Sequence, residues 1–560
     1  MKKQTMKIAL FAILAVCTAS PALARRRKPK PAQLNQTGQK LLEVYTDQLE
    51  SLKAQLVKTI PQVHERRKST YSKALKAEEE AKKNLQQAQK NLGKVKTAHA
   101  LVAHAKGKWI GGADRGIKKA KQKLKNATTE AERQAAQKEL EKWQKNRQDG
   151  VEALKERQAK LEQAKKEEPM LKRQLEVARE KLARAKENAM KAFKNLGLSD
   201  FLASGKLDGP LAKFVVLKEA TPRGLAEFAQ KGRKHRILVD MLLSNPDLMV
   251  QMVKADGAKD GNYGRAMEIY TDIQTASNKA RSGVLQNLAL AISLEHAIPV
   301  GQRNPKAETN APPTINPVQR YMHYEKACLN DELDPAFKTF TPWELRMVVN
   351  GNEPDEILAW GRTMLRNYRP DHILTDDYRW RYVAIVRSDV RYGSQDNKFD
   401  KPELQFFQNI LMNGGVCGRR AFFGRFILRA FGIPTTARPQ RGHAALGHWT
   451  PDGWVVCLGG GWGAGWTKTR YRDDLDFLAT TQARENMDAY MQVKRAQWVG
   501  DVLGERQVFG LNDRNTPGFW YGVSLYKQRA IVEDAKTLEA VGTDIGEANV
   551  TKEIVDIIKV

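Results

Sequence analysis

The chain has 560 residues, of which 94 are Lys or Arg and 64 are Asp or Glu, so its formal net charge is +30. This length exceeds that of one ordinary domain and predicts roughly two to four structural units. A composition of 41% hydrophobic and 28% charged residues excludes global disorder and a polytopic membrane protein, and only 4 cysteines exclude a disulfide-stabilised scaffold.

The positive charge is concentrated in one segment of the chain. Residues 25–200 carry 44 Lys and Arg against 22 Asp and Glu, a net charge of +22. Residues 201–560 carry 47 against 42, a net charge of +5. The basic charge therefore belongs to one segment and not to the whole chain.

The N-terminus has the pattern of an export signal. Lysines precede the apolar run 8–16, which is followed by the tripeptide A-L-A at 22–24. A charged n-region, a short apolar h-region and an A-x-A site predict a secretory signal peptide over residues 1–24. The apolar run is too short to cross a bilayer, which takes about 20 residues. We therefore expect an exported protein, in the periplasm, the cell envelope or the extracellular space.

Residues 25–35 are expected to form a basic tail, and residues 36–195 have the apolar spacing of a coiled coil. Apolar side chains alternate at steps of three and four along 42–56, 81–95 and 154–185. This alternation keeps one apolar seam along a helix and predicts long helices that pair with one another.

The glycines and prolines of this helical arm predict its turn and its joints. We expect an antiparallel hairpin that turns near Gly111 and Gly112, with a parallel dimer as the alternative. Pro61 and Pro169 are expected at kinks or joints. The positive charge of the arm has two interpretations: attraction to a polyanion, or a solvated face that keeps long helices soluble. Few aromatic residues interleave with the charges, so no stacking platform for single-stranded nucleic acid is expected.

The second half of the chain is expected to be globular. Residues 196–300 contain apolar stretches with helical spacing and predict a helical region. Residues 301–320, rich in Pro, Asn and Thr, predict a linker. A mixed domain of helices and strands is expected over 321–500, followed by a C-terminal extension over 501–560. The expected fold class is therefore α+β, with a long N-terminal coiled coil, a helical middle region and this domain.

Cys417 has the sequence surroundings of a reactive cysteine. Two glycines lead to it, an amphipathic helix is expected to follow it, and the sequence G-I-P at 432–434 ends that helix. Cys417 is therefore expected at a helix N-terminus, where unpaired N–H groups and the helix dipole favour the thiolate. Arg419 and Arg420 are expected to add positive potential. The thiolate is the form that attacks a carbonyl carbon.

A β-hairpin is expected after this helix. The apolar runs 442–449 and 454–458 flank the sequence T-P-D-G at 450–453, which predicts a turn. His443 and His448 lie on the first strand, and either is a candidate to face a nucleophile on the preceding helix. A Cys–His pair forms thiolate and imidazolium, and the imidazolium then protonates the leaving amine.

These motifs, in their order along the chain, resemble the transglutaminase-like core of the papain-like superfamily. The resemblance rests on G-V-C at 415–417, L-R-A-F-G-I-P at 428–434, G-H-A at 442–444 and D-G-W at 452–454. It covers residues 414–466 clearly. The resemblance implies a transglutaminase-like α+β domain with Cys417 as the nucleophile and His443 as the general base and acid.

The third catalytic position departs from the family pattern. Four residues after the tryptophan of the D-G-W motif, where that family places an aspartate, this chain has Leu458. In such a triad the carboxylate fixes the histidine tautomer and stabilises the imidazolium. Asp473, Asp474 and Asp476 are downstream carboxylates, and a Cys–His dyad without a carboxylate is an alternative because thiols ionise readily. A domain without catalysis, in which Cys417 is a structural thiol, is the other alternative.

Further arrangements of the cysteines are weaker candidates. Cys417, His443, His448 and Cys457 form a set of metal-ligand types, but their spacing matches no zinc-finger pattern. A disulfide between Cys328 and Cys457 is one arrangement for an oxidising compartment. The glycine-rich run 459–466 lacks the residues of a phosphate-binding loop and is expected to border a cleft, with Trp462 or Trp466 as a wall.

The sequence therefore predicts an exported transglutaminase-like cysteine enzyme, a cysteine protease or acyltransferase, that attacks amide bonds of proteins or peptides through Cys417 and His443. Peptide or isopeptide hydrolysis, deamidation and amine transfer are all open. The alternative is a catalytically inactive cell-envelope scaffold that binds peptide and binds an anionic surface through its basic coiled coil. Neither hypothesis uses a cofactor or a metal, and nucleic acid is not an expected partner.

Overall fold

The computed structural model shows mainly helices and one small sheet. It describes residues 32–307, 309–393, 398–462, 464–468, 474–482, 486–508, 516–534 and 540–542. Within these residues the sheet is three-stranded and antiparallel, in the order β1-β2-β3, which confirms the expected α+β class. The predicted signal peptide and most of the predicted basic tail lie outside the described residues. No helix in the described ranges combines the length and the apolar character needed to cross a membrane.

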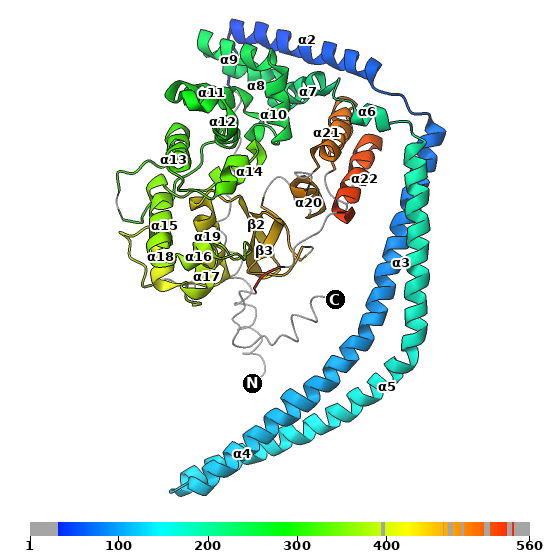
Figure 1. Ribbon diagram of the computed structural model, residues 1–560, viewed down its shortest axis with the longest axis vertical. Coiled ribbons are helices and arrows are strands. Elements are labelled where there is room, and N and C mark those ends of the chain that lie inside the picture. The colour runs from blue at the N-terminus through cyan, green and yellow to red at the C-terminus, as the bar shows by residue number, and fades with distance from the viewer. Residues whose placement is uncertain are drawn as a thin grey trace. The chain divides into compact units, whose positions relative to one another are not determined.

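The described residues divide into two compact units. Residues 61–200 form the unit that we call the arm, and residues 32–60 and 201–542 form the unit that we call the core unit. The arm consists of α3 (Glu65–His104), the π-helix η1 (Ala105–Ile110), α4 (Gly111–Asn126) and α5 (Glu130–Lys194). Figure 1 shows α3 and α4 lying alongside α5, which makes the arm a helical hairpin within one chain.

The hairpin turns at residues 127–129, so the prediction of a turn near Gly111 and Gly112 is wrong. A helix cap marks the actual turn. Thr129 Oγ1 accepts a hydrogen bond from the Glu132 N–H at 3.3 Å, and the Glu132 carboxylate accepts one from the Thr129 N–H at 3.2 Å. This reciprocal capping box starts α5 and satisfies N–H groups that the first helical turn leaves without partners.

The glycines of the arm have a packing role in place of a turning role. Any Cβ atom at Gly116 of α4 would clash with the ring of Trp143 on α5. A Cβ atom at Gly150 would lie 3.1 Å from the ring of Trp109. Glycine thus allows each indole to lie against the opposite helix. Pro169 lies inside α5.

The segment 36–59 belongs to the core unit and not to the arm. It forms α2 (Gln36–Thr59), which packs against α7 (Asp208–Ala220) and α8 (Pro222–Ala229). Its seam residues Tyr45 and Leu56 are each only 2% exposed. The prediction of one coiled coil over 36–195 is wrong for this segment, because heptad spacing does not specify which surface buries the seam.

The helical part of the core unit includes α2, α7 and α8. Its further elements are α6 (Ser199–Ala203, at the junction of the units), α9 (Arg233–Leu243), α10 (Pro246–Lys254), η2 (Lys259–Gly261), α11 (Tyr263–Ala276), η3 (Asn278–Arg281) and α12 (Gly283–Glu295). The predicted linker 301–320 overlaps α13, which begins at Pro317. Its first part is hydrogen-bonded to its surroundings, since the Arg303 N–H donates to Asn352 O at 2.8 Å.

The sheet-bearing part follows in the same unit. Its helices before the sheet are α13 (Pro317–Leu329), η4 (Pro335–Thr339), α14 (Pro342–Val349), α15 (Asp355–Tyr368), α16 (Asp371–Leu374), α17 (Ile385–Ser388), α18 (Phe406–Asn413) and α19 (Cys417–Ala430). The strands are β1 (Thr435–Gln440), β2 (His443–Thr450) and β3 (Gly453–Cys457), and α20 (Asp474–Gln482), α21 (Met487–Val502) and α22 (Phe519–Asp534) follow. The predicted helix after Cys417 and the predicted hairpin with its turn between Thr450 and Gly453 are both confirmed.

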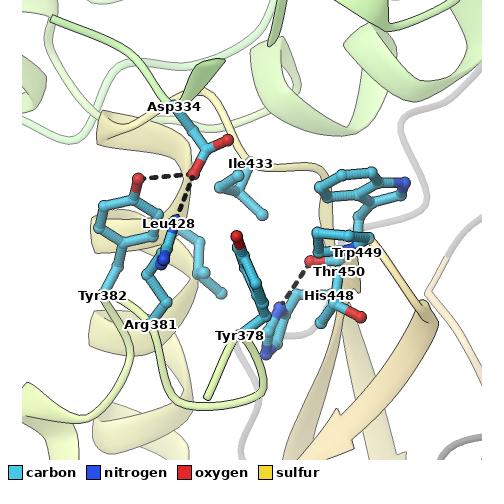
Figure 2. A pocket seen from close by; sticks show the side chains of 10 residues that line it. Asp334, Tyr378, Arg381, Tyr382, Leu428, Ile433, His448, Trp449 and Thr450 are labelled. Atoms are coloured by element: carbon cyan, nitrogen blue, oxygen red, sulfur yellow. Dashed lines mark hydrogen bonds and ion pairs between the residues drawn. The ribbon is translucent and has the colours of Figure 1, made fainter. Parts of the chain in front are cut away.

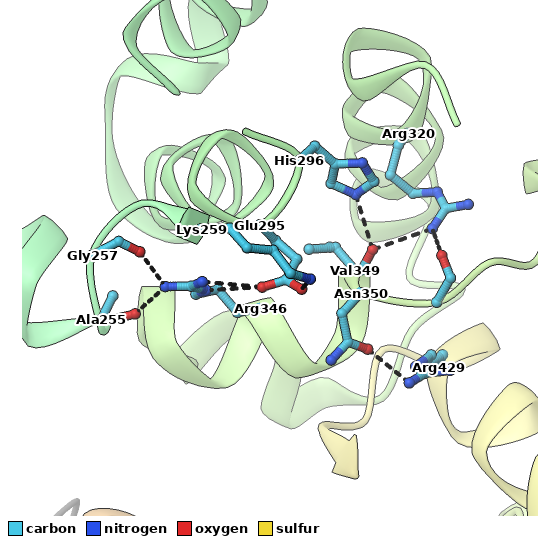
Figure 3. Close-up of polar contacts among 11 residues, drawn as sticks. Ala255, Gly257, Lys259, Glu295, His296, Arg320, Arg346, Val349, Asn350 and Arg429 are labelled. Atoms are coloured by element: carbon cyan, nitrogen blue, oxygen red, sulfur yellow. Dashed lines mark hydrogen bonds and ion pairs between the residues drawn. The ribbon is translucent and has the colours of Figure 1, made fainter. Parts of the chain in front are cut away.

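A buried ion pair joins the helical part to the sheet-bearing part, as Figure 3 shows. Glu295, the last residue of α12, pairs with Arg346 of α14 at 3.1 Å and with Lys259 at 2.5 Å. Within the predicted C-terminal extension, the described helix α22 packs against α21. The helical region, the sheet-bearing domain and the described part of this extension therefore form one unit.

Candidate functional site

Cys417 is the first residue of α19 and is half-buried. The backbone before it is bonded to the segment 391–393. The Gly415 N–H donates to Arg391 O at 3.0 Å, and the Gly393 N–H donates to Gly415 O at 3.2 Å. Gly414 has φ +74°, and a Cβ atom there would clash with Arg391 O. Gly414 and Gly415 thus allow the segment 391–393 to lie close to the backbone just before Cys417 and to hydrogen-bond to it.

The two arginines of the first turn of α19 have different surroundings. Arg419 is buried, and its guanidinium pairs with Asp400 at 2.7 Å. Arg420 donates to Val390 O and lies over the ring of Tyr392, 5.7 Å from its centroid. The positive potential that we expected from Arg419 is therefore offset by a carboxylate.

Helix α19 and strand β2 lie against each other and run in the same direction. At one point of contact, a Cβ atom at Gly424 would lie 2.7 Å from the side chain of Leu446. Leu428 follows Gly424 by about one turn of the helix, and His448 follows Leu446 by two residues of the strand. Leu428 and His448 line the same small cavity (Figure 2). Later residues of the helix therefore lie near later residues of the strand.

This shared direction brings the two predicted catalytic residues to the same end of the contact. Cys417 precedes Gly424 by seven residues of helix, and His443 precedes Leu446 by three residues of strand. At about 1.5 Å per helical residue and about 3.3 Å per strand residue, both are about 10 Å back from the contact.

His443 is oriented by a backbone carbonyl group. Its Nε2 lies 2.6 Å from Leu458 O. A carbonyl oxygen only accepts hydrogen bonds, so Nε2 carries the hydrogen, and in the neutral ring Nδ1 then carries the lone pair. Leu458 is the residue at which the family resemblance would place an aspartate. The backbone of that position therefore makes the contact that the aspartate side chain would be expected to make.

His448 lies in a different environment and is not placed at the thiol. It is 1% exposed, its Nδ1 is 3.0 Å from Trp449 O and its Nε2 is 3.1 Å from Arg379 O. Burial lowers the pKa of His448, although both carbonyl groups act to raise it. Figure 2 shows the ring beside Tyr378 at the cavity described above. Of the two histidines predicted on this strand, His448 therefore has a structural position.

A second cluster of catalytic residue types lies between α16 and α17, and the sequence analysis did not find it. Ser388 Oγ is 2.8 Å from His372 Nε2 and 2.5 Å from Asp389 Oδ2. The hydroxyl has one proton, and the nearer, charged acceptor is Asp389, so the serine donates to Asp389 and accepts from His372. Arg369 pairs with Asp389 and also with Asp371. The serine proton is thus directed away from the histidine, and the cluster is a structural network.

The glycine-rich run after β3 is held against β1. Gln440 Nε2 donates to Gly460 O at 2.8 Å, and Gln440 Oε1 accepts from the Gly460 N–H at 3.1 Å. Arg438 also donates to Gly460 O and lies 4.8 Å from the ring centroid of Trp462. Trp462 therefore packs on the buried Arg438, whereas Trp466 is 47% exposed. Of the two tryptophans proposed as a wall, Trp466 is the accessible one.

The structure describes only some of the other groups that were predicted near the site. Asp473 and the side chains of Asp474 and Asp476 lie outside the described residues. None of the described cysteines is in a disulfide, and burial raises the pKa of the Cys328 thiol. Within the described ranges, no group of three or more His, Cys, Asp or Glu side chains is arranged to hold a metal ion.

No family model matches the chain, and no curated protein or solved structure is similar to it at a significant level. The catalytic roles of Cys417 and His443 therefore stay predictions from the sequence motifs.

Proposed function

We propose that the protein is a transglutaminase-like cysteine enzyme in which Cys417 attacks an amide carbonyl carbon and His443 transfers the proton. The observation that carries this proposal is the hydrogen bond from His443 Nε2 to Leu458 O at 2.6 Å. It leaves the Nδ1 lone pair as the proton acceptor, which is the effect that the carboxylate has in a Cys–His–Asp triad. The position of Cys417 at the first residue of α19 supports it, because a helix N-terminus stabilises a thiolate.

The proposed reaction follows from this pair. The Cys417 thiolate forms a bond to the carbonyl carbon, and the tetrahedral intermediate then expels the amine, which takes its proton from the His443 imidazolium. The product is a thioester on Cys417. Water then releases a carboxylic acid, which amounts to proteolysis or deamidation, whereas a lysine amine forms an isopeptide bond. We favour hydrolysis of peptide or isopeptide bonds, because the predicted export signal points to envelope or extracellular peptides.

Alkylation of Cys417 by iodoacetamide across pH tests the proposal. An ordinary thiol with a pKa of about 8.5 is well under about 1% thiolate at pH 6. At pH 6 we expect Cys417 to react with iodoacetamide at least about tenfold faster than such an ordinary thiol. His443→Gln keeps a hydrogen-bond donor but has no titrating base, so it should reduce this rate to that of an ordinary thiol. Cys328 and Cys457, which are 7% and 0% exposed, serve as internal controls.

Three activity assays complete the test: peptide cleavage, ammonia release from glutaminyl peptides, and incorporation of an amine into protein. Cys417→Ala should abolish whichever of these the wild-type protein shows, and His99→Ala, on an exposed arm position, should leave it unchanged. The enzyme proposal fails if Cys417 reacts at pH 6 like an ordinary thiol and Cys417→Ala changes none of the three assays.

The arm supports a second proposal, that it binds an anionic surface of the cell envelope. Its residues 61–200 carry 36 Lys and Arg against 19 Asp and Glu. Lys118, Lys119 and Lys121 are exposed on α4, the helix that ends at the turn of the hairpin. Binding to vesicles with anionic headgroups should weaken as salt is raised. Changing these three lysines to Glu should weaken it further, and changing them to Arg should not; equal binding by both variants would contradict the proposal.

A further inference from the structure

We infer that Val541 is a positioning residue for His443, acting through the backbone of Leu458. The inference rests on the proposed function, because it concerns how the proposed general base is held. It is based on the short segment 540–542, which comes after α22 in the chain and pairs with the end of β3. Neither the motif at Cys417 nor the pattern of β2 and β3 indicates this segment.

Val541 pairs with β3 on the edge that β2 does not cover. The Val541 N–H donates to Val456 O at 2.9 Å, and the Leu458 N–H donates to Val541 O at 3.0 Å. These two bonds form a parallel bridge between Cys457 and Val541, while Cys457 is paired with Leu446 of β2 on its other side. The end of β3 is thus bonded on both edges.

The segment is also seated by packing. Val541 is 7% exposed. Gly542 has φ +64°, and a Cβ atom there would lie 2.7 Å from the ring of Trp380. The guanidinium of Arg387 lies 4.7 Å from the centroid of the same ring. Glycine is therefore required at 542 both by its backbone conformation and by the close approach of the indole.

Leu458 has a backbone conformation that its neighbours must maintain. Its φ is +62°, in the left-handed region, which costs a residue with a Cβ atom about 1–2 kcal/mol. Such a conformation persists only where surrounding contacts hold it. Both polar groups of Leu458 are engaged, since its N–H donates to Val541 O and its carbonyl oxygen accepts from His443 Nε2. The strained residue thus lies between the segment 540–542 and the histidine.

The consequence for His443 is direct. Without the bond to Val541, Leu458 can relax to a negative φ, and the rotation of its peptide groups moves the carbonyl oxygen away from the ring. His443 Nε2 then loses its acceptor, and the tautomer with the lone pair on Nδ1 is no longer favoured. Val541 therefore controls the proton acceptor for Cys417 without contacting the substrate or the thiol.

Val541→Pro in the full-length protein is the principal test. Proline removes the N–H that donates to Val456 O, and this weakens the pairing that places Val541 O at the Leu458 N–H. Val541→Ala keeps both backbone bonds and is the matched control. At pH 6 we expect alkylation of Cys417 to slow about tenfold in Val541→Pro and by less than about twofold in Val541→Ala, the loss expected when a general base is misoriented. The acid limb of the pH profile should move to higher pH in Val541→Pro alone.

A second pair of variants tests Leu458 itself. Leu458→Gly accepts a positive φ and keeps both backbone bonds, so its profile should match the wild type. Leu458→Pro lacks the N–H and fixes φ near −65°, so it should behave like Val541→Pro. Thermal unfolding of each variant shows whether the fold is retained. Should both proline variants fail to fold, the imidazole ¹⁵N shifts of His443 in the wild-type protein decide, because the inference requires the Nε2–H tautomer.

The outcomes separate this inference from the proposed function. If the wild-type protein shows no His443-dependent reactivity, the proposed function is wrong. If that reactivity is present and a folded Val541→Pro keeps the wild-type profile, the positioning role of Val541 is wrong and the enzyme proposal stands. An Nδ1–H tautomer in the wild-type protein would overturn the positioning role and would also remove the hydrogen bond that carries the enzyme proposal.

Discussion

Glu295 provides a quantitative test of how the core unit is held together. Its side chain is 11% exposed and contacts both Lys259 and Arg346 (Figure 3). Arg346 also donates to the carbonyl oxygens of Ala255 and Gly257. Burial acts to raise the pKa of Glu295, but the two cations outweigh it and lower the pKa from 4.5 to about 2. The perturbation that we consider is Glu295→Gln, which keeps the shape of the side chain and removes its charge.

A pKa lowered from 4.5 to about 2 corresponds to about 3 kcal/mol of free energy of unfolding at neutral pH. Because the folded value is the lower one, this contribution is fully present above pH 4.5 and is lost as the pH falls through 2. We therefore expect Glu295→Gln to lower the free energy of unfolding by about 3 kcal/mol at pH 7, and by less than half of that at about pH 3. Removing one partner is costly because Arg346 and Lys259 remain without their counter-charge.

Denaturant unfolding of the full chain, followed by tryptophan fluorescence at both pH values, measures this difference. The matched control is Glu227→Gln in α8. Glu227 pairs with Arg223, and the two side chains are 25% and 49% exposed. Such surface pairs contribute about 0.5 kcal/mol or less. A Glu295→Gln variant within about 1 kcal/mol of the wild type at pH 7 would refute the reasoning, since breaking a buried pair costs about 3 kcal/mol or more. A loss of equal size at both pH values would refute it too.

Three further predictions concern glycines and a cap. Gly116→Ala should lower the free energy of unfolding of the arm by about 1–3 kcal/mol, measured by far-UV CD melts, because its methyl group would clash with the indole of Trp143 on α5. A Cβ atom at Gly107 would have nothing within 4 Å, so the control Gly107→Ala should be neutral or stabilising. Thr129→Ala should cost about 1 kcal/mol in the same melts through loss of the capping box, and no measurable change would argue against that cap. Gly414→Ala should slow alkylation of Cys417, because the positive φ of Gly414 and its closeness to Arg391 O exclude a side chain. The control Gly461→Ala should not slow it. Equal rates in the two variants would show that the bonding of residues 414–415 to the segment 391–393 is dispensable.

Local signals account for what the sequence predicted about the site. The helix that begins at Cys417 follows from the glycines before it and the G-I-P sequence after it, and the hairpin follows from its T-P-D-G turn. Each of these depends on residues close together in the chain. The candidate roles of Cys417 and His443 depend on the family resemblance and stay predictions.

The features that the sequence did not reveal depend on tertiary contacts. Heptad spacing places α2 and α3 in one pattern, although only α3 pairs with α5 and α2 packs on the core unit. The turn of the arm is an exception, because its signal is local: Thr129 and Glu132 form a capping box, whereas Gly111 and Gly112 lie within continuous helix. The contact between Val541 and β3 joins segments far apart in the chain, and no local pattern encodes it.

The hydrogen bond to Leu458 changes what a missing carboxylate means for a Cys–His pair. A backbone carbonyl group fixes the tautomer of His443 as a carboxylate would, but it is neutral. Hydrogen bonds to charged groups contribute about 1.5–3 kcal/mol, against about 0.5–1.5 kcal/mol for neutral ones, so the imidazolium is stabilised by roughly 1 kcal/mol less. Because the backbone makes this contact, the side chain at 458 carries no information about it, and a search for an aspartate at that position cannot distinguish an active pair from an inactive one.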